Sequence, residues 1–201
     1  MKLNHAYVMT GGIATGKSTV CTLLKTQGFS LIDADMIAKE KLESSKSELG
    51  ELFGDSIFEG DRIDRKKLAD IIFSSKEQRD KLNALIHPKV REEIDKQAKE
   101  KEKFELPYLI DIPLYFESEG YDCKMVVVVY TPKEIQLDRL ISREGLSKLE
   151  ALKRIESQID IEKKRSMADW VVDNSKDLKH LQCEVEKFIE YLGWVYAGIK
   201  I

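Results

Sequence analysis

Residues Gly11-Gly12-Ile13-Ala14-Thr15-Gly16-Lys17-Ser18 match the pattern G-x-x-x-x-G-K-[ST]. An apolar run, Ala6–Met9, precedes them, and a helical pattern from Ser18 to Gln27 follows. This context suits a phosphate-binding loop, because glycines let the backbone wrap an anion and the helix N-terminus adds partial positive charge. The alternative, a glycine-rich turn with an incidental lysine, does not explain the flanking strand and helix.

Each polar side chain of this loop has an expected task. Lys17 can reach the β- and γ-phosphates of a bound nucleoside triphosphate, and the Ser18 hydroxyl can bind Mg²⁺. Thr19, in the first helical turn, can add a phosphate contact. The loop therefore predicts ATP and Mg²⁺ as ligands.

Short apolar runs recur along the rest of the chain. They lie at Phe29–Ile32, Tyr108–Ile112, Lys124–Tyr130 and Trp170–Val172. Helical patterns separate most of them, and several are unbroken rather than alternating, which is typical of strands buried on both faces. The sequence therefore predicts an α/β fold with a five-stranded parallel sheet flanked by helices.

Two stretches are too long for simple connections between strands. The first, about residues 38–104, predicts helices over Arg65–Phe73 and Glu77–Ile86, then Pro88 and a second, charged helix to Lys103. The other, about 133–167, is rich in arginine and lysine and is broken at Gly145. We expect a core of about residues 1–37, 105–132 and 168–201, with two helical insertions.

Acidic residues follow the predicted strands, where parallel α/β sheets bind their ligands. Asp33 and Asp35 share a face if the chain stays extended, and either could accept a proton from a substrate hydroxyl or hold a metal-bound water. Alternatively, Asp35 caps the next helix. Asp111 ends another strand and is the best candidate for a carboxylate near Mg²⁺, although it could be a solvated turn residue; Glu117 is a weaker candidate.

The second insertion carries the cations that phosphoryl transfer to an acceptor needs. Arg139 and Arg143 are four residues apart and share a helix face, as Arg154 and Gln158 do one helix later. An arginine that closes over the phosphates favours transfer to a hydroxyl over hydrolysis. Each arginine could instead lie on a solvated helix surface, and the run from residue 163 to 165 is expected to be surface charge.

Bulk composition excludes several other classes of protein. A net charge of −3 over 201 residues predicts no general attraction to nucleic acid or to a membrane. Three cysteines without a C-x-x-C pair argue against a disulfide framework or a zinc site and favour a reducing cytoplasm. The sequence leaves the oligomeric state undetermined.

Taken together, these motifs resemble the dephospho-CoA kinase family. In chain order the matching segments are Thr10–Ile13 with Gly16–Thr19, Ile32–Asp35, Ile63–Arg65, Ile86–Pro88, Ile112–Glu117, Arg154–Gln158 and Ala168–Asn174. They spread over almost the whole chain. The loop alone specifies only the superfamily, whereas Asp-Ala-Asp, His-Pro and Pro-Leu-x-Phe-Glu are more specific.

The resemblance implies transfer of a phosphate from ATP to the ribose 3′-hydroxyl of 3′-dephospho-CoA. It also implies that the first insertion, about residues 38–104, is a helical CoA-binding domain and that the second, about 133–167, is a helical lid. It implies Asp35 as the general base, with Asp33 as the alternative, Lys17 and Arg143 as further catalytic residues, and Arg139 and Asn174 beside ATP together with loop residues 12–19. The substrate-binding set that it implies is Asp35, Arg65, His87, Pro113, Phe116, Glu117, Arg154 and Gln158. From the residues alone, His87 could equally be a packed structural histidine.

Two positions depart from the family pattern, which usually has glycine at Ala14 and leucine at Tyr115. Ala14 must either adopt ordinary backbone angles or accept some strain. Two other functions remain open on the residues alone. One is a kinase for nucleoside monophosphates or another small molecule, and the other is a nucleotide-dependent switch, which the arginines and the Asp33/Asp35 pair disfavour.

Overall fold

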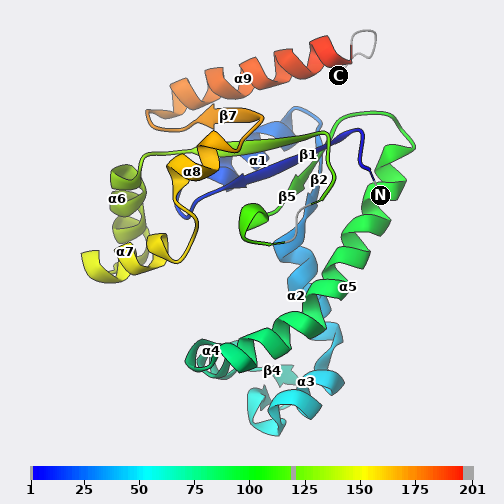
Figure 1. The fold of residues 1–201 in the computed structure, drawn as a ribbon, viewed down its shortest axis with the longest axis vertical. Helices are drawn as coiled ribbons and strands as arrows, with labels where there is room; N and C mark the ends of the chain where they lie inside the picture. The colour runs from blue at the N-terminus through cyan, green and yellow to red at the C-terminus, as the bar shows by residue number, and fades with distance from the viewer. Residues whose placement is uncertain (1, 119–120, 197–201) are drawn as a thin grey trace. The chain divides into compact units, whose positions relative to one another are not determined.

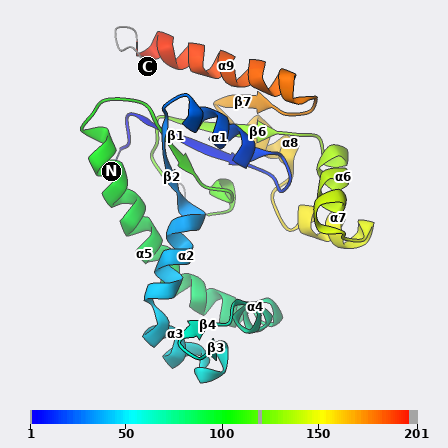
Figure 2. The same ribbon diagram turned by 180° about the vertical axis from the view of Figure 1, so that it is seen from behind.

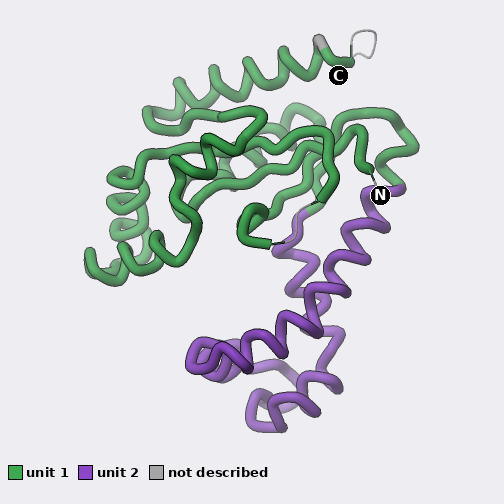
Figure 3. Tube along the Cα trace, viewed as in Figure 1, with its two compact units in different colours: residues 1–32, 100–201 green, residues 33–99 purple. Residues whose placement is uncertain are grey.

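The computed structural model describes residues 2–118 and 121–196. Its contacts divide the chain into two compact units, which Figure 3 shows in different colours. Unit 1 holds residues 1–32 and 100–201, and unit 2 holds residues 33–99. The second unit therefore interrupts the first in sequence.

A five-stranded sheet forms the centre of unit 1. Its strands, in spatial order, are β2 (Ser30–Asp33), β5 (Tyr108–Asp111), β1 (Ala6–Gly11), β6 (Met125–Tyr130) and β7 (Trp170–Asp173). The β1–β5, β1–β6 and β6–β7 pairs are parallel. The predicted α/β fold and its five strands are confirmed, and the loop that follows β1 leaves from the middle of the sheet.

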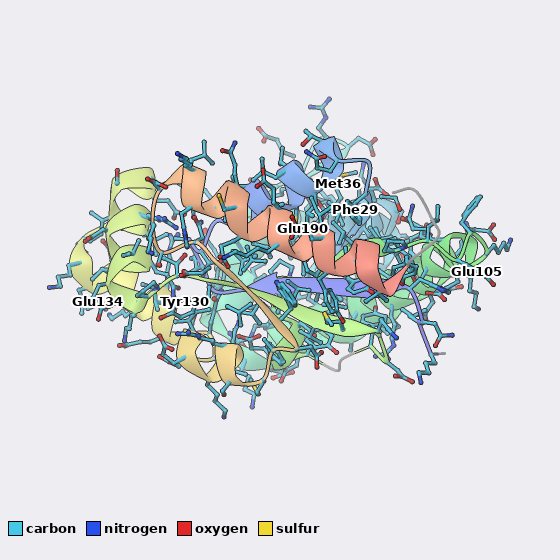
Figure 4. The ribbon with its side chains drawn as sticks, turned by 90° about the horizontal axis from the view of Figure 1, so that it is seen from above. Phe29, Met36, Glu105, Tyr130, Glu134 and Glu190 are labelled. Carbon is cyan, nitrogen blue, oxygen red and sulfur yellow. The ribbon has the colours of Figure 1, made fainter. Side chains whose placement is uncertain are left out.

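The valines of β6 show why this sheet is buried on both faces. Val127 and Val129 belong to a core cluster with residues of α1 (Lys17–Thr26) and α9 (Leu178–Val195). Val128 and Tyr130, which point the opposite way, pack with Ile161 of α8 (Ile161–Ser166). Figure 4 shows α9, with Glu190 labelled, lying across the sheet, and Figure 2 shows α8 beside β6.

Two further helices pack beside the phosphate loop. They are α6 (Lys133–Glu144) and α7 (Lys148–Glu156), which lie side by side in both ribbon views (Figures 1 and 2). Gly145 ends α6 in the left-handed conformation, as the sequence suggested, and Ser147 begins α7 with a capping box to Glu150. The glycine at the end of α6 and the capping box of α7 therefore determine where the two helices end and begin, and only a short connection separates them.

Unit 2 has a hydrophobic core of its own, built on Leu49, Ile57, Ile63 and Leu68. Its elements are α2 (Ala34–Ser44), α3 (Lys46–Phe53), η1 (Asp55–Ile57), β3 (Phe58–Glu59), β4 (Arg62–Ile63), α4 (Arg65–Ser74) and most of α5 (Lys76–Glu102). The β3–β4 hairpin is too short for a strand pattern to appear in the sequence. Asp64 caps α4 by accepting hydrogen bonds from the Lys66 and Lys67 amides.

The prediction of two helices separated at Pro88 is wrong, because α5 is continuous across this residue. Proline gives up one backbone hydrogen bond and usually costs about 3 kcal/mol inside a helix. Burial of Ile86 and Ile94 on the same helix, and the ion pair of Lys89 with Glu48 at 2.6 Å, oppose that cost. Within residues 2–118 and 121–196, no helix is both long enough and apolar enough to cross a bilayer.

Candidate active site

The phosphate loop has glycines where no side chain would fit. Gly16 caps α1 with φ 85°, and a Cβ atom there would collide with the Asn174 amide nitrogen. A Cβ at Gly12 would lie 2.8 Å from Gln136 Oε1. The Thr15 hydroxyl closes the loop by donating to the Gly12 carbonyl at 2.9 Å. The loop is thus a tight backbone turn at the N-terminus of a helix, which is the geometry that binds phosphate.

Residues at the ends of β6 and β7 support the loop from outside. Asn174 Nδ2 donates to the Thr15 carbonyl at 2.8 Å, and the Thr131 hydroxyl lies 3.1 Å from the same oxygen. Arg139 donates to the Asn174 carbonyl at 3.0 Å, so the alternative of a solvated Arg139 is wrong. The sequence analysis missed Thr131 and Gln136, although Thr131 directly follows the valine strand, where ligand-side residues are expected.

Lys17 forms an ion pair with Asp111 of β5. Both side chains are largely buried, with exposed fractions of 16% and 10%, so the alternative of a solvated turn aspartate is wrong. Cys21 Sγ lies 3.7 Å from the other oxygen of this carboxylate. Ser18 and Thr19 are exposed in the first turn of α1. A cation and a carboxylate therefore meet at the loop, and two hydroxyl-bearing residues lie in the helical turn that follows it.

Ala14 has a left-handed backbone, with φ 59°. We expected Ala14 either to adopt ordinary backbone angles or to accept strain, and it is strained. A left-handed conformation costs an alanine roughly 1–2 kcal/mol. Its methyl group packs, together with Ile13, against a cluster formed by Leu140, Ala151 and Ile155 of α6 and α7. This burial offsets the strain and joins the phosphate loop to the two arginine-bearing helices.

Asp33 and Asp35 lie at the junction of β2 and α2. Asp33 ends the strand and caps the helix, since its Oδ1 accepts a hydrogen bond from the Met36 amide at 2.9 Å. Asp35 is exposed in the first helical turn. The chain turns helical at Ala34, so the two carboxylates do not alternate along a strand. The capping role that we considered for Asp35 belongs to Asp33.

Glu144 holds both exposed arginines of α6 and α7. It pairs with Arg143 at 2.6 Å and also with Arg154. The hydrogen bond from Arg143 is the main reason that the pKa of Glu144 lies below its usual range, so this carboxylate is ionised near neutral pH. One negative side chain therefore offsets only part of the positive charge of the two arginines that were predicted to act on phosphates and substrate.

Gln158 does not share a helix face with Arg154, because α7 ends at Glu156 and the chain then turns into α8, which Asp160 caps. Its Oε1 accepts a hydrogen bond from the Ile13 amide at 2.9 Å. Gln158 thus contacts the phosphate loop directly. This contact joins residues 145 positions apart, which no local pattern could indicate.

The three residues predicted on the substrate side at 113–117 also make contacts inside unit 1. The Pro113 carbonyl accepts from the Thr10 hydroxyl at 3.1 Å, and Phe116 packs against the cluster around Val128. Glu117 pairs with Lys164 at 2.7 Å. Lys164 has an exposed fraction of 0%, so the expectation that residues 163–165 form a run of surface charge is wrong at this position.

Arg65 and His87 both lie in unit 2. Arg65 is 3.3 Å from Glu43 at a cleft of about 580 Å³, and the residues that line this cleft are Glu43, Lys46, Glu59, Asp61, Arg62, Ile63 and Arg65. His87 is exposed on α5, so the alternative of a packed structural histidine is wrong. The cleft is lined by three cations and three carboxylates, and a second cleft of about 710 Å³ in the same unit shares Lys46 and Asp61 with it.

A glycine-rich loop between β1 and α1, a lysine and a carboxylate at its mouth, and arginine-bearing helices packed against it together define a P-loop kinase. Comparison with known sequences narrows this class, because the pattern of the dephospho-CoA kinase family matches residues 7–180. The chain belongs to the dephospho-CoA kinase family. The resemblance seen in its motifs is therefore confirmed.

Individual relatives agree with this assignment over the full length. A dephospho-CoA kinase from Sulfurimonas denitrificans is 51% identical over 200 residues and covers 100% of both chains. One from Helicobacter pylori is 42% identical, covering 96% of this chain and 100% of its own. The solved dephospho-CoA kinase from Campylobacter jejuni is 35% identical, with a TM-score of 0.79 over 98% of this chain and 100% of that one.

Proposed function

We propose that this chain transfers the γ-phosphate of ATP to the ribose 3′-hydroxyl of 3′-dephospho-CoA, giving ADP and CoA. This is the final step of coenzyme A biosynthesis. The main support for this proposal is that the chain belongs to the dephospho-CoA kinase family. The phosphate loop, with the Lys17–Asp111 pair beside it, provides the groups that the transfer of a phosphate needs. Since both substrates are metabolites of the cell interior, we place the reaction in the reducing cytoplasm.

Lys17 and the loop amides would bind the β- and γ-phosphates. Because Lys17 is paired with Asp111 in this structure, binding would exchange a carboxylate partner for phosphate oxygens. The residues also fit Mg²⁺, which prefers hard oxygen ligands such as the Ser18 hydroxyl and the Asp111 carboxylate. A bound Mg²⁺ would neutralise charge that develops on the transferred phosphate.

Asp35 is our candidate for the general base that accepts the proton of the 3′-hydroxyl. Asp33 already uses one carboxylate oxygen to cap α2, whereas Asp35 is exposed in the first turn. The assignment is supported by this difference in local roles.

For the acceptor, the cleft at Arg65 is the feature of unit 2 that suits a phosphorylated ligand. Arg62 and Lys46 line it too, and cations of this kind recognise the pyrophosphate that dephospho-CoA carries. Arg65 and Lys46 are paired with Glu43 and Asp61, so binding would replace these carboxylates with phosphate oxygens. We therefore keep Arg65 and His87 as substrate-side candidates. Glu117 and Gln158 have partners within unit 1 that favour a structural role for both.

Replacing Arg143 with alanine is expected to slow phosphoryl transfer about 10²-fold or more, because an arginine that meets the phosphates stabilises their charge in the transition state. The single-turnover rate at saturating ATP and dephospho-CoA measures this step directly. The matched control is Lys153→Ala, which removes an exposed cation on the neighbouring α7. It should change the single-turnover rate by less than about twofold. An unchanged rate in Arg143→Ala would remove this residue from the mechanism.

The experiment that tests the function offers the purified chain ATP and Mg²⁺ with one acceptor at a time. We expect turnover with dephospho-CoA, with the new phosphate on the 3′-oxygen by ³¹P NMR, and little with nucleoside monophosphates or shikimate. Absence of turnover with dephospho-CoA would sink the proposal. Slow ATP hydrolysis without any acceptor would favour a nucleotide-dependent switch instead.

A further inference from the structure

Lys164 is the buried member of an otherwise exposed basic run. In the six-residue helix α8, Ile161 and Lys164 are three positions apart and both face the sheet, while Lys163 and Arg165 are exposed. Lys164 has an exposed fraction of 0%. A buried ammonium is costly, and replacing such a group with an apolar side chain is often neutral or stabilising, so its presence is weak evidence for a purely structural role.

The ammonium of Lys164 joins two parts of unit 1. It donates to the carbonyl of Gly11 at 3.0 Å and pairs with Glu117 Oε1 at 2.7 Å. Glu117 Oε1 also accepts a hydrogen bond from the Ile159 amide at 3.0 Å. The residue before Ile159 is Gln158, which accepts from the Ile13 amide. The first peptides of the phosphate loop are therefore held from outside by Lys164 and Gln158.

The contact with the Gly11 carbonyl acts on the neighbouring amide. In a trans peptide, the C=O of Gly11 and the N–H of Gly12 belong to one plane and point in opposite directions. A cation on the carbonyl oxygen therefore turns the Gly12 N–H away from Lys164, and it also polarises the amide, which strengthens this N–H as a donor. The backbone is closely packed here, since a Cβ atom at Gly11 would lie 2.8 Å from both Val129 O and the Thr15 hydroxyl oxygen.

We propose that Lys164 is a positioning residue for the phosphate loop: it orients the Gly11–Gly12 peptide for nucleotide binding, and Glu117 ties the same ammonium to the Gln158–Ile159 segment. Lys164 acts through the backbone and touches no phosphate itself. The proposal rests on the proposed function for its link to catalysis. Nucleotide affinity, however, can be measured whether or not dephospho-CoA is the acceptor.

Three variants separate positioning from stability. Lys164→Met keeps the unbranched shape of the side chain up to its last atom but removes the charge and both donated bonds, leaving the Glu117 carboxylate without this partner. Adding Glu117→Gln removes the lone carboxylate while its amide oxygen still accepts from Ile159. Lys163→Met changes the adjacent exposed lysine and is the matched control.

Each variant is measured for Tm, for ATP affinity by isothermal titration calorimetry, and for kcat and KM for ATP. We expect Lys164→Met to lower Tm and to weaken ATP binding about tenfold, the size of a lost charge-assisted hydrogen bond. In the double variant Tm should recover while ATP binding stays weak. The control should match the unchanged protein in Tm and affinity.

The double variant decides between the two roles. If ATP affinity recovers together with Tm, or if Lys164→Met binds ATP as the unchanged protein does, Lys164 is only structural and the proposal is overturned. If Lys164→Met does not fold, the ATP affinity of the double variant is compared directly with that of the unchanged protein. A protein that binds ATP normally but does not phosphorylate dephospho-CoA would contradict the proposed function and leave this test intact.

Discussion

Replacing Lys17 with alanine is expected to lower kcat for phosphoryl transfer by about 10³-fold, close to a loss of turnover. The ammonium is the cation at the first residue of α1, where it can stabilise the charge that develops on the β- and γ-phosphates. A steady-state assay with dephospho-CoA measures kcat, and single-turnover quenching confirms that the chemical step is the one affected.

A loss of structure could imitate this result, because Lys17 is also paired with Asp111. The variant therefore needs a melting curve, and we expect Tm to fall by only a few degrees, roughly. Lys25→Ala, at the other end of α1 and exposed, is the matched control and should keep kcat. A Lys17→Ala protein that melts normally and retains kcat would show that the loop does not act on phosphate.

Asp35→Asn should lower kcat by about 10²- to 10⁴-fold with little change in ATP affinity, since general base catalysis contributes an effect of this size. Asparagine has nearly the same shape as aspartate but cannot accept the proton of the 3′-hydroxyl. Comparing kcat with the dissociation constant for ATP separates a lost base from a damaged nucleotide site.

Asp33→Asn is the matched control for this experiment. Asparagine caps helices about as well as aspartate, so the hydrogen bond from the Met36 amide and the start of α2 should survive. We expect this variant to keep most of its activity. If Asp33→Asn instead abolishes turnover while Asp35→Asn keeps it, Asp33 is the base.

The sequence could predict the parts of this protein that depend on local patterns. Unbroken valine runs such as that of β6 identify strands that are buried on both faces, and the glycine-lysine pattern identifies the turn between β1 and α1. The family resemblance adds a prediction of which residues lie on the acceptor side. These signals concern residues adjacent in the chain, or spaced by one helical turn.

Features that depend on tertiary contacts could not be predicted in the same way. Pro88 reads as a helix break, yet buried residues on both sides of it keep α5 intact. Lys164 reads as surface charge within a basic run, and only its partners Gly11 and Glu117, far away in sequence, explain its burial. Likewise, no sequence pattern indicates that Arg143 of α6 and Arg154 of α7 share one carboxylate, Glu144.

The backbone of Ala14 has a consequence for how this chain can evolve. A relative with glycine at this position gains nothing from the apolar surface of α6 and α7, because glycine tolerates a positive φ without compensation. Here the methyl contact with the cluster of Leu140, Ala151 and Ile155 offsets the strain. Position 14 and these helix positions are therefore epistatic, and we expect them to change together among lineages that carry alanine in the loop.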